Sequence, residues 1–128
     1  MILLDTHAWI WWATGSPQLS SKASKAIRAA DSIYVNAISC WEVGMLVAKR
    51  RLELDRDVEV WVDQALKLPK IQLIPLSPGI AVKSTRLEGE FHGDPVDRII
   101  VATAKEYGCP ILSKDKRIRA FPGLKVIW

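Results

Sequence analysis

The chain has 128 residues, of which 49% are hydrophobic and 25% are charged, so we expect residues 1–128 to form a single globular domain. No apolar run approaches the roughly 20 residues that a membrane span requires, and residues 1–30 contain no cleavable signal pattern, so we expect a cytoplasmic protein without membrane contact. Eighteen Lys and Arg against 14 Asp and Glu give a net charge of +4, which favours polyanionic partners but identifies none.

The first half of the chain predicts short strands that alternate with helices. Residues 2–5 form an apolar run that is too short for a helix and ends in Asp5, which is typical of a buried strand. Pro17 then interrupts the helical pattern. Val58, Trp61 and the residues after them follow a helical period, and we expect this helix to pair with the preceding one. The predicted elements are a strand at 2–5, helices at 8–13 and 19–30, a strand at 32–36, and helices at 39–50 and 58–66.

The second half of the chain continues this alternation. Asp94 precedes Pro95, which places a capping acid before a proline at the first position of a helix, and Gly108 ends that helix. A polar loop at 88–93 comes before it. The other predicted elements are a strand at 71–74, a helix that begins with Ser77 and Pro78, a helix at 95–107, a strand at 110–112, a helical turn at 116–120 and a strand at 124–127.

Short apolar strands between amphipathic helices predict an α/β fold. We expect a three-layer α/β/α domain with a central, mainly parallel sheet of five strands. Ligands of such sheets bind beyond the carboxyl ends of the strands. The residues at those ends therefore carry the functional information in this sequence.

Four acids lie at the ends of predicted elements, where all of them can face this edge of the sheet. They are Asp5 at the end of the first strand, Glu42 and Asp97 in the first turns of helices, and Asp115 after the fourth strand. Carboxylates that lie this close repel one another unless a cation balances their charge. The pattern therefore predicts a divalent metal ion, because such ions prefer oxygen ligands.

Each of the four acids also has a purely structural interpretation. Asp5 could bond to the local backbone of a turn, and Glu42 could close a capping box with Ser39. Asp97 could be favoured by the dipole of its helix, and Asp115 could be a solvated surface charge. The conjunction of all four acids, rather than any one of them, supports the metal site.

Four blocks of sequence follow one another along nearly the whole chain. They are LLDTHAWIWW at the start, NAISCWEVGMLVAKRRLEL in the middle, HGDPVDRIIVATAKEYGCPILSKD toward the end, and the terminal LKVIW. Together these blocks resemble the PIN-domain family, and particularly the VapC-type toxins of prokaryotic toxin–antitoxin pairs. The resemblance implies the same α/β/α fold that the alternation of strands and helices predicts.

The resemblance also implies roles for individual residues. Matched one by one, the metal ligands of the family correspond to Asp5, Glu42, Asp97 and Asp115, with Mg²⁺ or Mn²⁺ as the metal. In the DPVDR block Asp97 takes the ligand position, which leaves Asp94 as a helix cap or an outer group. The implied reaction is hydrolysis of an RNA phosphodiester bond, which leaves a 5′-phosphate and a 3′-hydroxyl.

Three functional readings follow from the resemblance. The first is an endoribonuclease toxin that forms a homodimer and is inhibited by a small antitoxin protein in its acidic groove. The second is a solitary PIN-type nuclease that processes RNA. The third is a PIN-fold interaction module without activity, against which the presence of all four acids argues. A nucleotide-binding module is disfavoured, because no GxGxxG and no GxxxxGK[ST] follows any predicted strand.

Basic residues close to the acids in sequence are candidates for binding the RNA substrate. They are Arg98, which follows Asp97, and Lys114, Lys116 and Arg117 around the last acid. Phosphate-binding cations beside a metal site suit a nuclease. The same residues could equally form a solvated surface.

Several residues have no function assigned by these patterns. We expect Trp9, Trp11 and Trp12 to pack in the core, although a groove for a partner helix is an open alternative. Cys40 and Cys109 belong to no CxxC pair, and we expect both to be reduced thiols with a structural role.

The two histidines receive no catalytic role, because metal-aided hydrolysis does not require them. We expect His7 to pack beneath the first helix. His92 belongs to the loop before the helix that Asp94 caps.

Overall fold

The computed structural model describes all residues from 1 to 128. Five strands form one sheet in the order β3-β2-β1-β4-β5, and every neighbouring pair is parallel. The prediction of a five-stranded α/β/α fold is confirmed, with a sheet that is entirely rather than mainly parallel. The strands are β1 (Ile2–Leu4), β2 (Ile33–Asn36), β3 (Ile71–Ile74), β4 (Ile111–Leu112) and β5 (Val126–Ile127).

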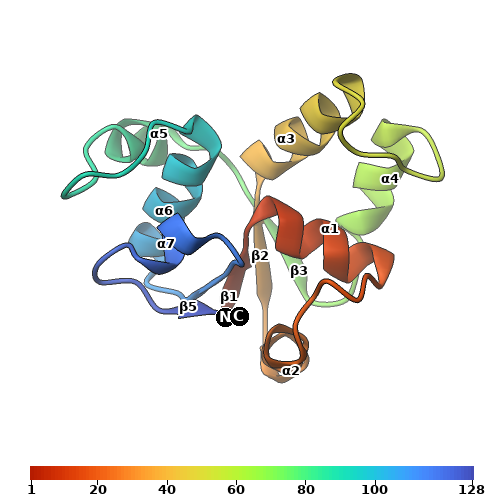
Figure 1. Cartoon of the computed structure of the whole chain (residues 1–128), viewed down its shortest axis with the longest axis horizontal. Helices are drawn as coiled ribbons and strands as arrows, with labels where there is room; N and C mark the ends of the chain where they lie inside the picture. Colours follow the sequence, from red (N-terminus) through yellow and green to blue (C-terminus); the bar gives the residue numbers. More distant parts are fainter.

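Seven helices cover the two faces of this sheet. In Figure 1, α1, α3 and α4 lie on one side of the strands, and α5, α6 and α7 lie on the other. Two residues of α2, Ala23 and Ile27, belong to the same core cluster as the first group. The helices are α1 (Thr6–Thr14), α2 (Ser21–Ala29), α3 (Ala37–Ala48), α4 (Val58–Ala65), α5 (Pro78–Ser84), α6 (Pro95–Tyr107) and α7 (Lys116–Arg119).

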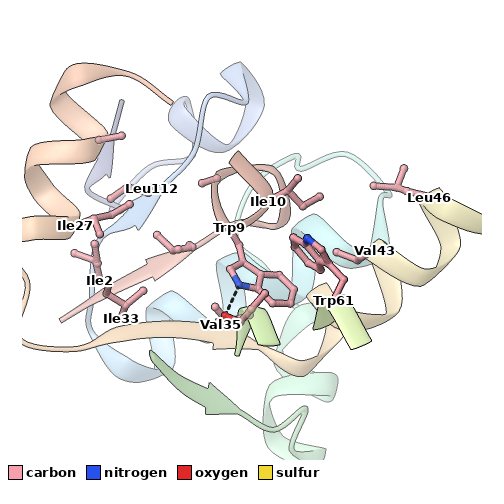
Figure 2. Close-up of a cluster of buried hydrophobic side chains, with 14 residues drawn as sticks. Ile2, Trp9, Ile10, Ile27, Ile33, Val35, Val43, Leu46, Trp61 and Leu112 are labelled. Atoms are coloured by element: carbon pink, nitrogen blue, oxygen red, sulfur yellow. Dashed lines mark hydrogen bonds between the residues drawn. The ribbon is translucent and has the colours of Figure 1, made fainter. Parts of the chain in front are cut away.

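The larger core cluster lies between the sheet and α1 to α4. Figure 2 shows Trp9 at its centre, facing Trp61 from α4. The Trp9 side chain is fully buried, its ring centroid lies 5.4 Å from that of Trp61, and its indole Nε1 donates to the carbonyl of Ala65 over 3.4 Å. The prediction that Trp9 packs in the core is confirmed, whereas Trp11 and Trp12 are only partly buried.

The opposite face of the sheet packs against α6. Leu3 and Ile111 point to this side, where they meet Ile100, Val101 and Ala104. Their strand neighbours Leu4 and Leu112 belong to the other cluster, as the alternation of side chains along a strand requires. Both faces of the short strands are therefore buried, which explains their continuous apolar runs.

A chain of buried hydrogen bonds joins the start of α3 to α6. Asn36 ends β2 and caps α3, because its side chain accepts from the amide of Ile38 over 2.8 Å. The Asn36 amide group donates over 2.9 Å to the hydroxyl of Thr103, which itself donates to the carbonyl of Ile99. Helix α3 therefore begins two residues before Ser39, and the proposed capping box between Ser39 and Glu42 is wrong.

Other features of the chain bear on the expectations from the sequence. Cys40 and Cys109 are both free thiols, as expected. None of the helices combines the length and the apolar character that a membrane crossing demands. Helices α3 and α4 pack against each other, which confirms the predicted pair.

Candidate active site

A pocket of about 480 Å³ opens beyond the carboxyl ends of β1 and β4. The chain runs from β1 through β2 to β3 in one direction and places β4 on the other side of β1, so the pocket lies where the strand order reverses. This switch point is the usual ligand site of a parallel α/β sheet. The structure brings all four predicted acids to this acidic pocket, together with a fifth; they are Asp5, Glu42, Asp94, Asp97 and Asp115.

Asp5 forms the floor of the acidic pocket. It caps α1, because its carboxylate accepts from the amide of Ala8 over 2.8 Å, and only 8% of the residue is exposed. Burial raises the pKa of Asp5 to about 6, an effect that a hydrogen bond from Ser113, the Ala8 bond and nearby His7 oppose and that Glu42 reinforces. The local capping role and the site role thus coexist in one side chain.

Asp97 lies in the first turn of α6, where Asp94 caps the helix by accepting from the amides of Val96 and Asp97. Burial is the main cause that raises the pKa of Asp97 to about 7, and the charges of Asp94, Asp115, Glu42 and Asp5 add to the rise in that order. Asp97 is therefore the residue on which the negative charges of the pocket converge. Its charged form is costly unless a cation enters.

His92 lies beside Asp97 in the loop before α6. Its Nε2 is buried and 3.2 Å from Asp97 Oδ2, but the two groups lack the alignment of a hydrogen bond. Its Nδ1 accepts from the amide of Asp94 over 3.3 Å, which fixes the ring next to the helix start. Position in the sequence alone did not reveal this contact, because the loop brings His92 back toward the helix that follows it.

Asp115 is the acid that Arg117 approaches most closely. It caps α7 through the amides of Arg117 and Ile118, and the Arg117 guanidinium lies 3.1 Å from its Oδ2 and 3.8 Å from Asp97 Oδ2. Partial burial alone would raise the pKa of Asp115, but the hydrogen bonds from Arg117 and from the α7 amides outweigh burial and lower this pKa. Arg117 thus partly neutralises one side of the pocket.

Glu42 reaches the acidic pocket from the second turn of α3. One turn earlier, the Ser39 hydroxyl accepts a hydrogen bond of 2.9 Å from the Thr6 hydroxyl, which fastens α3 to α1 behind the acids. Glu42 raises the pKa of both Asp5 and Asp97, so its carboxylate acts on both. Glu42 therefore lines the acidic pocket and does not close a capping box with Ser39.

The predicted substrate-binding cations separate into two groups. Lys114 and Arg117 line the acidic pocket, and the Lys114 ammonium lies 5.8 Å from the centroid of the Trp11 ring. Arg98 does not line it, because its guanidinium donates to the backbone carbonyls of Ser84, Phe91 and His92. The geometry therefore favours a structural role for Arg98, in which it holds the loop before α6.

Two further residues differ from the expectations. Arg51 lines the pocket although no local motif marked it, because the turn after α3 carries it back toward the acids. His7 is exposed at the pocket with its ring centroid 5.7 Å from that of Trp11, so the prediction that it packs beneath α1 is wrong. Lys116, at the exposed start of α7, is not part of the pocket lining.

The donor chemistry of the pocket fits a divalent cation. The acids supply hard oxygen donors, and two of them have raised pKa values because burial and like charges are uncompensated. In this conformation no three His, Cys, Asp or Glu side chains form a ready cluster for one metal ion. A cation would therefore bind as side chains of the pocket adjust, with Arg117 the positive group that it would compete against.

Comparisons with known proteins agree with this architecture. A model of the PIN domain matches residues 2–124. The chain is 37% identical over 119 residues to Ribonuclease VapC22 of Mycobacterium tuberculosis, which covers 93% of this chain and 90% of that protein. Its fold is similar to VapBC2 from Rickettsia felis, with a TM-score of 0.71 at 15% identity, over 98% of this chain and 97% of that one. It is also similar to VapC20 from Mycobacterium tuberculosis, with a TM-score of 0.69 at 14% identity, over 98% and 99%.

The fold and the pocket define a class of protein: a parallel α/β/α domain with a carboxylate-rich site at its switch point. Within that class the chain belongs to the PIN domain family. The resemblance noted in the sequence is confirmed.

Proposed function

We propose that this protein is a metal-dependent endoribonuclease and the toxin of a toxin–antitoxin pair. The observation that carries the proposal is the convergence of Asp5, Glu42, Asp97 and Asp115 in one pocket at the switch point of the sheet. The 37% identity to a ribonuclease supports RNA as the substrate. The similar fold of VapC20, a toxin that cleaves the sarcin–ricin loop, supports the toxin role.

The metal would be Mg²⁺ or Mn²⁺, held by Asp5 and Asp97, with Glu42 and Asp115 bound directly or through water. When bound, it supplies a water of lowered pKa and stabilises charge on the phosphodiester. Asp5 is fixed by its cap bond to Ala8, so its carboxylate is held in place before the cation arrives. Burial keeps bulk water away from this oxygen and strengthens its interaction with a cation.

The cations of the pocket would orient the RNA. Lys114 and Arg117 line the pocket next to the acids, and Arg51 lines it near α3. A phosphate that approaches these side chains gains charge-assisted hydrogen bonds while the nearby carboxylates hold the metal. Binding should therefore weaken steeply with salt.

The proposed partner is a small antitoxin that inserts a cation into the acidic pocket. Arg117 already contacts Asp115 and Asp97, so the pocket accepts a guanidinium. We also propose a homodimer, because edge strand β3, the segment after it and α5 expose apolar side chains at Leu73, Leu76 and Val82. Sedimentation of wild type and of a Leu73→Lys variant would test the dimer.

The proposed activity is tested by incubating the chain with a panel of structured and single-stranded RNAs and Mg²⁺ or Mn²⁺. We expect cleavage by wild type, loss of cleavage in Asp97→Asn and in EDTA, and unchanged circular dichroism of the variant. Glu53→Gln, at an exposed position outside the acidic pocket, is the matched control and should cleave normally. Equal cleavage by Asp97→Asn and wild type would overturn the assignment.

A further inference from the structure

A second pocket adjoins the acidic one. It has a volume of about 340 Å³, within the usual range for small-ligand sites, and is formed by the loop at 88–92 and by residues 120–122, which follow α7. Arg117 and His92 also line it, and Arg117 belongs to the acidic pocket as well. A group bound in the second pocket would therefore lie directly beside the proposed cleavage site.

The walls of the second pocket are aromatic. Phe91 is half-buried, and its ring meets buried Phe121 edge to face at a centroid distance of 5.4 Å and an angle of 87°. The His92 ring centroid lies 4.3 Å from that of Phe91, with the two rings tilted by 43°. Aromatic rings and guanidinium planes are the surfaces on which single-stranded bases stack in RNA-binding proteins.

The mouth of the same pocket is acidic. Glu88 and Glu90 line it, both are exposed, and neither forms an ion pair. Two uncompensated carboxylates repel a phosphate, so the mouth disfavours the RNA backbone. They favour groups that donate hydrogen bonds, such as the amino groups on base edges.

We propose that this second pocket, the aromatic pocket formed by Phe91, His92, Phe121 and Arg117 with Glu88 and Glu90 at its mouth, binds one unstacked base of the RNA next to the cleaved bond. Guanine is the expected base, because its N1–H and N2 amino group lie side by side and can both donate to one carboxylate. The phosphate attached to that nucleotide stays near Arg117, on the acidic-pocket side. This inference rests on the proposed ribonuclease function and names a determinant of its sequence preference.

The first test maps the cleavage sites in a pool of single-stranded RNAs of random sequence. We expect wild type to favour guanine at one position next to the cut, and the double variant Glu88→Gln, Glu90→Gln to lose that preference by roughly tenfold. Glu53→Gln removes the same kind of charge elsewhere on the surface and should keep the preference. Cleavage by the double variant with an unchanged base profile would overturn the aromatic pocket and leave the nuclease proposal intact.

The second test measures binding without cleavage. Wild type in EDTA is titrated into fluorescent seven-nucleotide RNAs that carry one guanine, one inosine or one abasic site among uridines. We expect affinity to fall from guanine to inosine, which lacks the 2-amino group, and again to the abasic RNA, by roughly tenfold in total. Phe91→Leu keeps an apolar side chain but removes the stacking surface, so it should reduce the difference in affinity between the guanine and abasic RNAs.

This second measurement stands even if no RNA is cleaved. A wild-type chain that cuts nothing overturns the proposed function, whereas equal affinity for the guanine and abasic RNAs overturns the base site. Thermal unfolding of Phe91→Leu and of the double variant checks that each folds, and the wild-type comparison of the three RNAs depends on neither variant.

Discussion

Asp5 and Asp115 each cap a helix, yet they lie in opposite electrostatic surroundings. On the β1 wall of the acidic pocket, formed by Asp5 and Glu42, no Lys or Arg forms an ion pair, and burial raises the pKa of Asp5 to about 6. On the α7 wall, formed by Asp115 and Arg117, the guanidinium and the helix amides lower the pKa of Asp115. A cap bond alone therefore does not keep a buried carboxylate charged. A bound cation would stabilise the charged carboxylates of the β1 wall more than that of the α7 wall.

The largest expected effect is a difference in RNA cleavage between variants of the two walls. Asp5→Asn keeps a good helix cap but removes a charge from the floor of the pocket, so we expect RNA cleavage to fall roughly a thousandfold. Asp115→Asn, at the half-neutralised wall, should reduce it only about tenfold to a hundredfold. Single-turnover rates of both variants at saturating Mn²⁺ test this order, and an equal loss in the two would remove the distinction.

The second effect is a pH dependence of stability in the metal-free protein. The pKa of Asp5 is about 6 and that of Asp97 about 7 in the folded state, against roughly 4 in an unfolded chain. Between about pH 4 and pH 7 the folded protein binds more protons, so its free energy of unfolding falls as the pH rises, by on the order of 3 kcal/mol from Asp5 alone. This stability is fully present below about pH 4 and lost above about pH 7.

Urea unfolding in EDTA between pH 4 and pH 8 measures this dependence. The double variant Asp5→Asn, Asp97→Asn is the reference, because it keeps all other titrating groups and lacks the two raised ones. The stability of wild type relative to the variant should decrease toward pH 8, and saturating Mn²⁺ should reverse the decrease. A relative stability that rises with pH would contradict the raised pKa values.

A third, smaller effect tests whether Arg117 causes the lowered pKa of Asp115 at the α7 wall. Arg117→Ala should raise the pKa of Asp115, as seen by carboxyl NMR titration, because the main opposing group is gone. Its side chain is 60% exposed, so solvent screens the ion pair and the free energy of unfolding should change little. RNA binding should weaken several-fold, and the slope of log affinity against log salt should decrease by about one. An unshifted Asp115 would assign the low pKa to the helix amides alone.

The smallest effect distinguishes two neighbouring lysines. Lys114 lines the acidic pocket above Trp11, whereas Lys116 is exposed and outside the pocket lining. Lys114→Ala should weaken RNA binding about threefold, and Lys116→Ala should change it by less than that. Fluorescence anisotropy at low salt compares the pair, and a larger effect of Lys116→Ala would move the RNA path away from the pocket.

Much of the fold and the gathering of the acids followed from local signals. Apolar runs and helix caps, such as Asp94 before Pro95, depend only on residues that are neighbours in the sequence. In a parallel sheet the carboxyl ends of the strands lie at one edge, which brings the acids together. Distant contacts decided the rest. The start of α3 depends on a hydrogen bond between Asn36 and Thr103, which lie 67 positions apart. Likewise, no sequence pattern around Arg98 indicated that its guanidinium donates to three backbone carbonyls.

The hydrogen bond from Asn36 to Thr103 joins the helix that carries Glu42 to the helix that carries Asp97. The separation of these two carboxylates is thus set in the dry interior, by side chains that no ligand touches. The distance between two carboxylate ligands affects which ion a site prefers, because Mg²⁺ tolerates less variation in its oxygen shell than larger cations do. For the proposed metal site, substitution of Asn36 or Thr103 is therefore expected to change which ion is preferred without any change at the surface.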